Sequence, residues 1–178
     1  MSTYVIDNSH SEVGFSVRHM VFAKVRGHFG KWAATLQLDP SDVSRSSVEV
    51  KIDANSIDTR EEKRDGHLRS PDFLDTARYP ELAFKSRRVA TIDGKRFEVV
   101  GDLTIRDVTR EVTLEVEELG RGTDPWGNDR IAFTAKTAIN RADFGLKWNQ
   151  ALETGGVLVG DKVEIEINLE AMAARKAA

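Results

Sequence analysis

Four histidines, His10, His19, His28 and His67, are the side chains of this chain that are best suited to bind a metal ion. They lie in four separate segments without an HxH or HxxxH pair, and the chain has no cysteine to complete a ligand set. Metal sites that can be recognised in a sequence commonly contain pairs of this kind, and none is present, so we expect no metal site. For His19 and His67 we expect hydrogen bonds to backbone or carboxylate groups, or contact with the polar head of a ligand.

Serines close to histidines are the second candidate for chemistry, with Ser9 and Ser11 around His10 and Ser16 before His19. Neighbours along a strand point to opposite faces, so these pairs do not form a catalytic triad. The chain has no GxSxG elbow, no P-loop and no GxGxxG motif. We therefore expect a protein that is not an enzyme, without catalytic residues.

Charge and hydropathy exclude two further classes of partner. The net charge is −3, and basic residues are interleaved with acidic ones, so we expect no nucleic-acid binding. No stretch reaches the roughly 18 apolar residues of a membrane span, so we expect no stable membrane insertion. The first residues, MSTYVIDNSHSEVGF, lack the basic and apolar regions of a signal peptide. We expect a cytoplasmic protein, or a periplasmic one if a leader has been removed.

The elements that must position any site follow from the alternation of apolar and polar residues. Eight alternating runs cover residues 13–17, 32–38, 48–54, 82–84, 97–105, 112–116, 131–139 and 163–169. Such alternation is typical of antiparallel strands with one buried face. Eight strands of this kind can close into a barrel or stack as a sandwich, and we favour the barrel because it removes the exposed edges. We predict a single all-β domain over residues 1–170 and a frayed, alanine-rich tail over residues 171–178.

Residues 64–86 interrupt this pattern with a charged segment that carries Pro71 and Pro80. Thr59, followed three residues later by Glu62, resembles a capping box and predicts a short helix through about Leu68. We expect this insert to cap one end of the barrel.

An eight-stranded barrel is just wide enough to be filled by side chains or to hold one small ligand. The residues alone favour a filled core, because every small β-domain needs one. The candidates for the wall of an apolar pocket are Phe15, Val17, Trp32, Leu36, Phe73, Leu74, Phe84, Phe133, Phe144 and Trp148. Their alternative role is ordinary core.

Charged residues near these segments could contact a ligand or serve a structural role. Arg18, beside His19, could donate to a carbonyl or phosphate of a ligand head group, and its alternative is a salt bridge to an acid. Arg64-Asp65 and Arg141-Asp143 are expected first as structural locks that tie the insert and a late loop to the barrel.

Several ordered blocks of the sequence resemble one known family. They are DNSHSEVGFSVRHM (7–20), VRGHFGKW (25–32), RDGHLRSPDFLDTARYPELAFKS (64–86), GDLTIRDVTREVTLEV (101–116), INRADFGLKW (139–148) and VGDKVEIEINLE (159–170). Together they resemble the YceI family of lipocalin-like polyisoprenoid-binding proteins, over about Tyr4 to Glu170. The resemblance implies an extended eight-stranded antiparallel barrel with a helix over one end, around a long hydrophobic tunnel for an isoprenoid chain.

Because of this resemblance, we predict that the barrel contains an apolar pocket and is not filled by a core. We predict a non-catalytic carrier of a polyisoprenoid, such as an isoprenoid quinone or a polyprenyl compound, or of another long-chain amphiphilic lipid. This cargo takes the place of a cofactor, and Arg18 and His19 would contact its head near the entrance. Two alternatives stay open: an enzyme acting on a small hydrophobic substrate in the same cavity, and a stress or interaction module with a filled barrel. A homodimer is compatible with the sequence and common in relatives.

Overall fold

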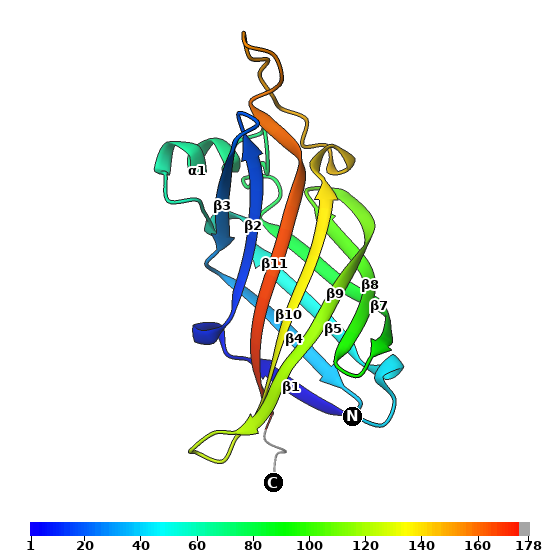
Figure 1. Ribbon diagram of the computed structural model, residues 1–178. Helices are drawn as coiled ribbons and strands as arrows, with labels where there is room; N and C mark the ends of the chain where they lie inside the picture. The colour runs from blue at the N-terminus through cyan, green and yellow to red at the C-terminus, as the bar shows by residue number, and fades with distance from the viewer. Residues whose placement is uncertain (175–178) are drawn as a thin grey trace.

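The computed structural model describes residues 1–174 and consists mainly of antiparallel strands (Figure 1). The strands are β1 (Ser2–Ile6), β2 (Glu12–His19), β3 (Ala23–Phe29), β4 (Trp32–Leu38), β5 (Ser47–Asp53), β6 (Ile57–Asp58), β7 (Glu81–Asp93), β8 (Arg96–Ile105), β9 (Val108–Thr123), β10 (Asp129–Asn140) and β11 (Val159–Ala173). The helices are α1 (Glu62–Arg69) and the short 3₁₀-helices η1 (Asn8–His10), η2 (Val43–Arg45), η3 (Ala54–Ser56) and η4 (Arg141–Phe144). Among these residues, no helix has the length and apolar character needed to cross a bilayer.

The strands close into a barrel. They follow one another in the order β1-β4-β5-β7-β8-β9-β10-β11, and β11 pairs with β1 to complete the ring. Beyond β1, β11 also pairs with β2, which continues through β3 to β6 and lengthens the wall toward one end. The predicted eight-stranded antiparallel barrel is therefore confirmed, with eight positions around its ring and β2, β3 and β6 as extensions.

Strands β1, β3 and β6 were not among the predicted alternating runs. In β3 the residues that share the inner face are Val25, Gly27 and Phe29, so a glycine interrupts the apolar series. This glycine has a packing role, because a Cβ on Gly27 would lie only 2.5 Å from Cζ of Phe15. The phenyl ring of β2 thus fills the space that Gly27 leaves open. Strands β1 and β6 span five and two residues, too few to show a period.

A bulge in β7 lies opposite Gly101, where the sequence predicted a bend. The pairing between β7 and β8 shifts between Ser86 and Arg88, directly beside the Ser86–Gly101 pair. A Cβ on Gly101 would lie 2.6 Å from Cζ of Phe84 and 2.5 Å from the Lys85 carbonyl oxygen. Gly101 therefore allows both the bulge and the inward packing of Phe84.

The predicted start of the helix is wrong. The N-cap of α1 is Glu61, whose carboxylate accepts hydrogen bonds from the backbone N–H groups of Lys63 and Arg64. Arg60 has a positive φ of 65°, which separates Thr59 from the first turn of the helix. Thr59 instead donates from its backbone N–H and its hydroxyl to the Asp65 carboxylate. The insert lies at one end of the barrel (Figure 1).

The predicted frayed tail is wrong for its first residues. Strand β11 runs to Ala173, and Ala171 is fully buried where it pairs with Ile6 of β1 and Ile131 of β10. At this point β11 lies between β1 and β10, and small alanine side chains fit where these strands close the barrel. Residues 175–178 of that prediction lie outside the described residues.

Candidate functional site

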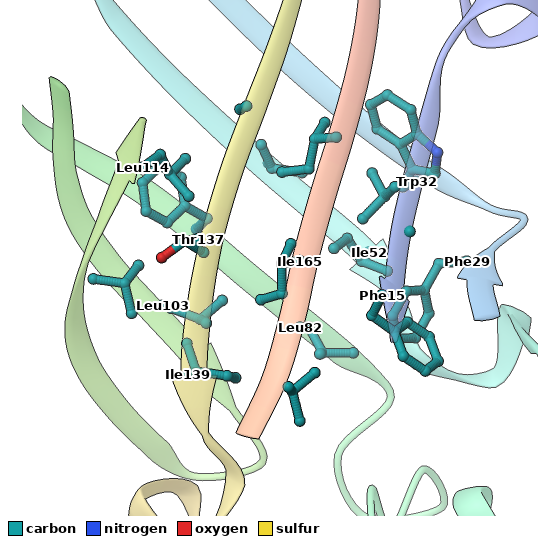
Figure 2. A pocket seen from close by; sticks show the side chains of 18 of the residues that line it. Phe15, Phe29, Trp32, Ile52, Leu82, Leu103, Leu114, Thr137, Ile139 and Ile165 are labelled. Carbon is teal, nitrogen blue, oxygen red and sulfur yellow. The ribbon is translucent and has the colours of Figure 1, made fainter. Parts of the chain in front are cut away.

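Side chains do not fill the barrel interior. They leave a cavity of about 890 Å³ that extends from the insert to the opposite end. This volume is within the usual range of ligand sites, about 300–1,000 Å³. The middle of its wall consists of inward-facing apolar residues from most strands, among them Leu103, Leu114 and Ile165 (Figure 2). The arrangement suits a long apolar molecule, and it contradicts a filled barrel.

The structure places most of the predicted wall residues on this cavity. Those that line it are Phe15, Val17, Trp32, Leu36, Phe73, Leu74, Phe84, Phe133 and Trp148. Phe144 is not a lining residue, because it lies in η4 and is buried in the core with 2% of its surface exposed. That the lining residues bind a ligand stays a prediction.

Many wall residues were not singled out from the sequence. Figure 2 shows Phe29, Ile52, Leu82, Leu103, Leu114, Thr137, Ile139 and Ile165 on the cavity together with predicted residues. Nearly all of these residues belong to the predicted alternating runs. They share the apolar face of their strand with the wall residues that were predicted. The signal that could have found them was the period of two, because one face of each strand points inward.

An aromatic cluster lines the cavity beside the insert. We call this end of the barrel the lid end, and it comprises α1, residues 70–80 and residues 145–158. His67 of α1 contacts Phe73 edge-on with a centroid distance of 5.1 Å, and Trp148 with a distance of 4.5 Å. Phe73 and Trp148 lie 5.5 Å apart. Nε2 of His67 lies 2.8 Å from the Asp72 carboxylate, which confirms the expected hydrogen bond to an acid. All three aromatic residues also line the cavity, so they form part of its wall at this end.

Arg141 ties the late loop to the barrel, as predicted, but not through Asp143. Arg141 is 3% exposed, and its guanidinium donates to the carbonyl oxygens of Leu146 at 2.7 Å, Trp148 at 2.9 Å and Gly160 at 2.9 Å. Burial lowers the pKa of the Arg141 guanidinium, and the charge of Asp161 opposes this shift. The Arg141 guanidinium therefore fixes the backbone of Trp148, whose side chain lines the cavity.

Arg64 and Asp65 lock the insert internally. Asp65 is 4% exposed and accepts from the Thr59 backbone N–H at 2.9 Å and from its hydroxyl at 2.5 Å. Arg64 donates from Nε to the Thr59 hydroxyl at 2.7 Å and from Nη2 to the Thr59 carbonyl at 2.6 Å. Both side chains are bound to the same threonine, which fixes the start of α1 against the strand before it.

Arg18 and His19 of β2 both border the cavity near the lid end, but their side chains point to opposite faces of the strand, and His19 shares the face of Phe15 and Val17. Nη1 of Arg18 donates to the Phe22 carbonyl oxygen at 3.5 Å, and within residues 1–174 the side chain makes no ion pair. The alternative of a salt bridge to an acid is therefore not seen. The Arg18 side chain is exposed, and its contact with a head group at the entrance stays a prediction.

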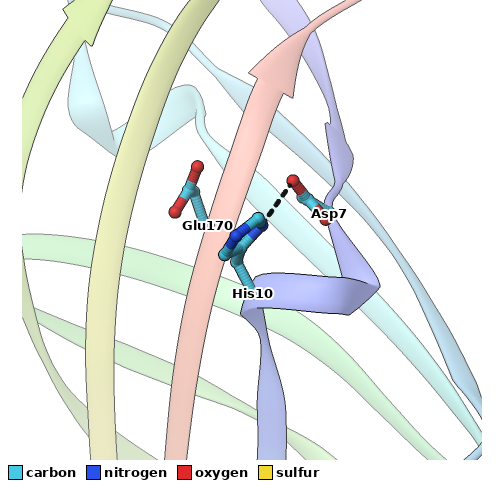
Figure 3. Close-up of side chains that lie close together, drawn as sticks. All are labelled: Asp7, His10 and Glu170. Carbon is cyan, nitrogen blue, oxygen red and sulfur yellow. Dashed lines mark hydrogen bonds and ion pairs between the residues drawn. The ribbon is translucent and has the colours of Figure 1, made fainter. Parts of the chain in front are cut away.

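A second cluster of polar groups lies on the outside of the barrel. Ligand atoms of Asp7, His10 and Glu170 all lie within 4.8 Å of one another, with His10 Nδ1 2.9 Å from Asp7 (Figure 3). Arg130 already neutralises both carboxylates, with Nη1 2.8 Å from Asp7 and 2.6 Å from Glu170. Its Nε lies 2.8 Å from Asp124. The cluster is an ion-pair network that joins the closing strands, and it supports no proposal of a metal site.

This network predicts a pH dependence of folding. Hydrogen bonds from Ser9, Arg130 and His10 hold the pKa of Asp7 well below its ordinary value, and those from Asn128 and Arg130 do the same for Asp124. Carboxyls with a lowered folded-state pKa contribute stability above the unfolded pKa of about 3.9, and that contribution is lost as the pH falls toward the folded-state pKa. We expect Arg130→Met to lower stability at pH 6 and to flatten its loss below about pH 4.

Urea unfolding midpoints between pH 6 and pH 2.5 test this expectation. The matched control is Arg87→Met, which removes exposed ion pairs with Asp102 and Glu111 on the barrel exterior. If Arg130→Met and the wild type lose stability in parallel across this range, the network does not cause the acid sensitivity.

The sequence profile of the YceI-like domain matches residues 4–171. The chain belongs to the YceI family. Among its YceI relatives, a UPF0312 protein of Vibrio parahaemolyticus is 37% identical over 145 residues, covering 80% of this chain and 77% of the relative. A UPF0312 protein of Staphylococcus aureus is 35% identical over 171 residues, covering 96% of this chain and 97% of the relative.

Solved structures show the same YceI barrel. The crystal structure of BcnA from Burkholderia cenocepacia has a TM-score of 0.82 at 25% identity, covering 93% of this chain and 98% of that one. A domain from Saccharophagus degradans, described as polyisoprenoid-binding and implicated in plant cell wall breakdown, has a TM-score of 0.70 at 17% identity. That match covers 98% of this chain and all of the domain, and at this identity it shows the fold alone.

Proposed function

We propose that this YceI protein is a non-catalytic carrier that holds a polyisoprenoid lipid inside its barrel. The observation that carries the proposal is the cavity of about 890 Å³ with apolar walls along the length of the barrel. Each buried CH₂ group contributes about 0.8 kcal/mol, so one five-carbon isoprene unit contributes a few kcal/mol. Several units are therefore held tightly without any charged contact.

The cargo class we propose is an isoprenoid quinone or a polyprenyl compound, and other long-chain amphiphilic lipids would compete for the same tunnel. Support comes from the shared fold of the polyisoprenoid-binding domain of Saccharophagus degradans. Selection among such lipids would depend on the length of the tunnel and on the few polar groups at its ends, because the walls are indifferent to apolar detail. Arg18 and His19 would meet the polar head as the lipid enters.

Titration of the delipidated protein with a long-chain isoprenoid quinone tests the proposal. We expect one quinone per barrel, and we expect Phe133→Asp to abolish binding because the carboxylate would lie against the apolar chain. The matched control is Thr134→Asp on the next position of β10, which faces away from the cavity. Circular dichroism of both variants should show an intact β-sheet.

Two results would count against the proposal. Failure of the wild-type protein to bind any long-chain isoprenoid would contradict the carrier function. Equal binding by Phe133→Asp and the wild type would show that the lipid binds somewhere other than the barrel interior.

A further inference from the structure

The end of the cavity opposite the lid is lined by Tyr4, Glu118 and Arg121, which we call the base end. It lies beside the N-terminus and the turn between β9 and β10 (Figure 1). Tyr4 of β1 pairs with Leu36 of β4, whose buried side chain lies on the cavity, so the tyrosine shares the inner face. A charged pair and a phenol thus border the base end of a cavity whose middle is apolar.

A β-bulge places both charged side chains inside. Glu118 pairs with Phe133, Gly120 pairs with Ala132 and Arg121 pairs with Ile131, which leaves Leu119 as the extra residue of β9. Residues 118 and 121 are three apart and would face opposite sides of a regular strand. The extra residue changes the alternation, so Arg121 joins Glu118 on the inner face and Leu119 is 56% exposed outside.

The two side chains form a bidentate ion pair. Nε of Arg121 lies 2.7 Å from Oε1 of Glu118, and Nη2 lies 2.9 Å from Oε2. The guanidinium holds the pKa of the Glu118 carboxyl below its ordinary value, and Tyr4 is close enough to act on the charge of Arg121. A guanidinium has five N–H donors, and this pair uses two of them. Hydrogen-bonding capacity therefore remains at the base end.

Contact between an apolar chain and this ion pair would be energetically unfavourable. The side chains of Glu118 and Arg121 are 12% and 54% exposed, so water reaches the guanidinium. A hydrocarbon tail that filled the base end would strip this water and leave charged groups without partners, which is unfavourable. An oxygen-bearing head group would replace the water. Ion pairs this accessible contribute little to folding, so stability alone gives a weak reason for charges on the inner face.

We propose that the base end binds the neutral, oxygen-bearing head group of the cargo, with its tail directed toward the lid. A carbonyl oxygen would accept from Arg121 or Tyr4, and a hydroxyl could also donate to Glu118. A neutral head is expected because the pair has no net charge, and an anionic head would be repelled by the carboxylate. This inference rests on the proposed carrier function and adds the orientation and head-group selectivity of the cargo.

Competition between two lipids of similar chain length tests the inference. One is an isoprenoid quinone, and the other is a headless isoprenoid hydrocarbon. We expect the wild type to prefer the quinone about tenfold, the effect of one hydrogen bond to a charged group. The double variant Glu118→Leu/Arg121→Leu, which leaves no unpaired charge, should lose this preference and bind the hydrocarbon at least as well.

Two controls decide the interpretation. Arg121→Lys should recover part of the preference, and Arg87→Leu, on the exterior, should keep all of it. An unchanged preference in the double variant, or its loss in Arg87→Leu, would overturn the inference while lipid binding persists. Absence of binding of either lipid to the wild type would instead contradict the carrier function.

The two tyrosines of the chain give an independent readout. Tyr4 lies at the base end, and Tyr79 lies in the insert, where Arg106 packs 5.6 Å from its ring. With isotope-labelled tyrosine, we expect the NMR signals of Tyr4 to differ between the quinone and hydrocarbon complexes, and those of Tyr79 to coincide. The reverse pattern would place the head at the lid and overturn the inference.

Discussion

Ala135→Trp is expected to reduce the affinity for a long isoprenoid chain by more than tenfold while the barrel stays folded. Ala135 is 6% exposed, lies in the middle of β10 and lines the cavity between its partners Val116 and Ile167. The indole would occupy space in the tunnel. Displacing only two CH₂ groups of the cargo costs about 1.6 kcal/mol, which already corresponds to more than tenfold.

The matched control is Ala138→Trp, which introduces the same side chain on the same strand at an exposed position. Binding of a quinone series with increasing tail length, measured on delipidated protein, separates the two variants. Ala135→Trp should retain short-tailed quinones and reject long ones, whereas Ala138→Trp should follow the wild type. Unimpaired binding of the long tails by Ala135→Trp would mean that the chain does not pass the middle of the tunnel.

Arg141→Met is expected to destabilise the protein by about 3 kcal/mol and to open the lid end. Arg141 is buried, and its loss leaves the carbonyl oxygens of Leu146, Trp148 and Gly160 without their donor. Each unsatisfied buried group costs about 1–3 kcal/mol. Because Trp148 packs against His67 and Phe73, release of its backbone should also speed the loss of bound lipid.

The control for this variant is Arg110→Met. Arg110 is exposed and donates from Nε to the Asp143 carbonyl oxygen at 3.2 Å, close to the same loop. Urea unfolding gives the free energy, and the rate of lipid transfer to an acceptor gives the effect on the lid. Similar values for Arg141→Met and Arg110→Met would show that the buried guanidinium does not hold the loop.

The barrel could be predicted because one buried face per strand leaves a period of two in the sequence. That period placed Phe15, Trp32, Phe84 and Phe133 on the inner wall. It failed for β3, where Gly27 takes an inward position so that the Phe15 ring can pack over it. Packing between distant strands determines this choice, and the local pattern does not contain it.

The polar residues of the site were harder to predict. A hydrogen bond from His67 to a carboxylate was among the expectations, but its partner Asp72, five residues away, was not identified. Glu118 and Arg121 were missed because a bulge reverses the alternation between them, and the shift is defined only by pairing with β10. Phe144 was wrongly predicted to line the cavity. It belongs to η4, outside the strands, and packs in the core.

The lipid content of the natively purified protein tests the proposed carrier function most directly. Organic extraction followed by mass spectrometry should release close to one isoprenoid quinone or polyprenyl molecule per chain, and the same extraction of Ala135→Trp should yield little or none. An extract without such a lipid, still empty after the wild-type protein has been incubated with a mixture of isoprenoid quinones, would contradict the account of the barrel as a lipid carrier.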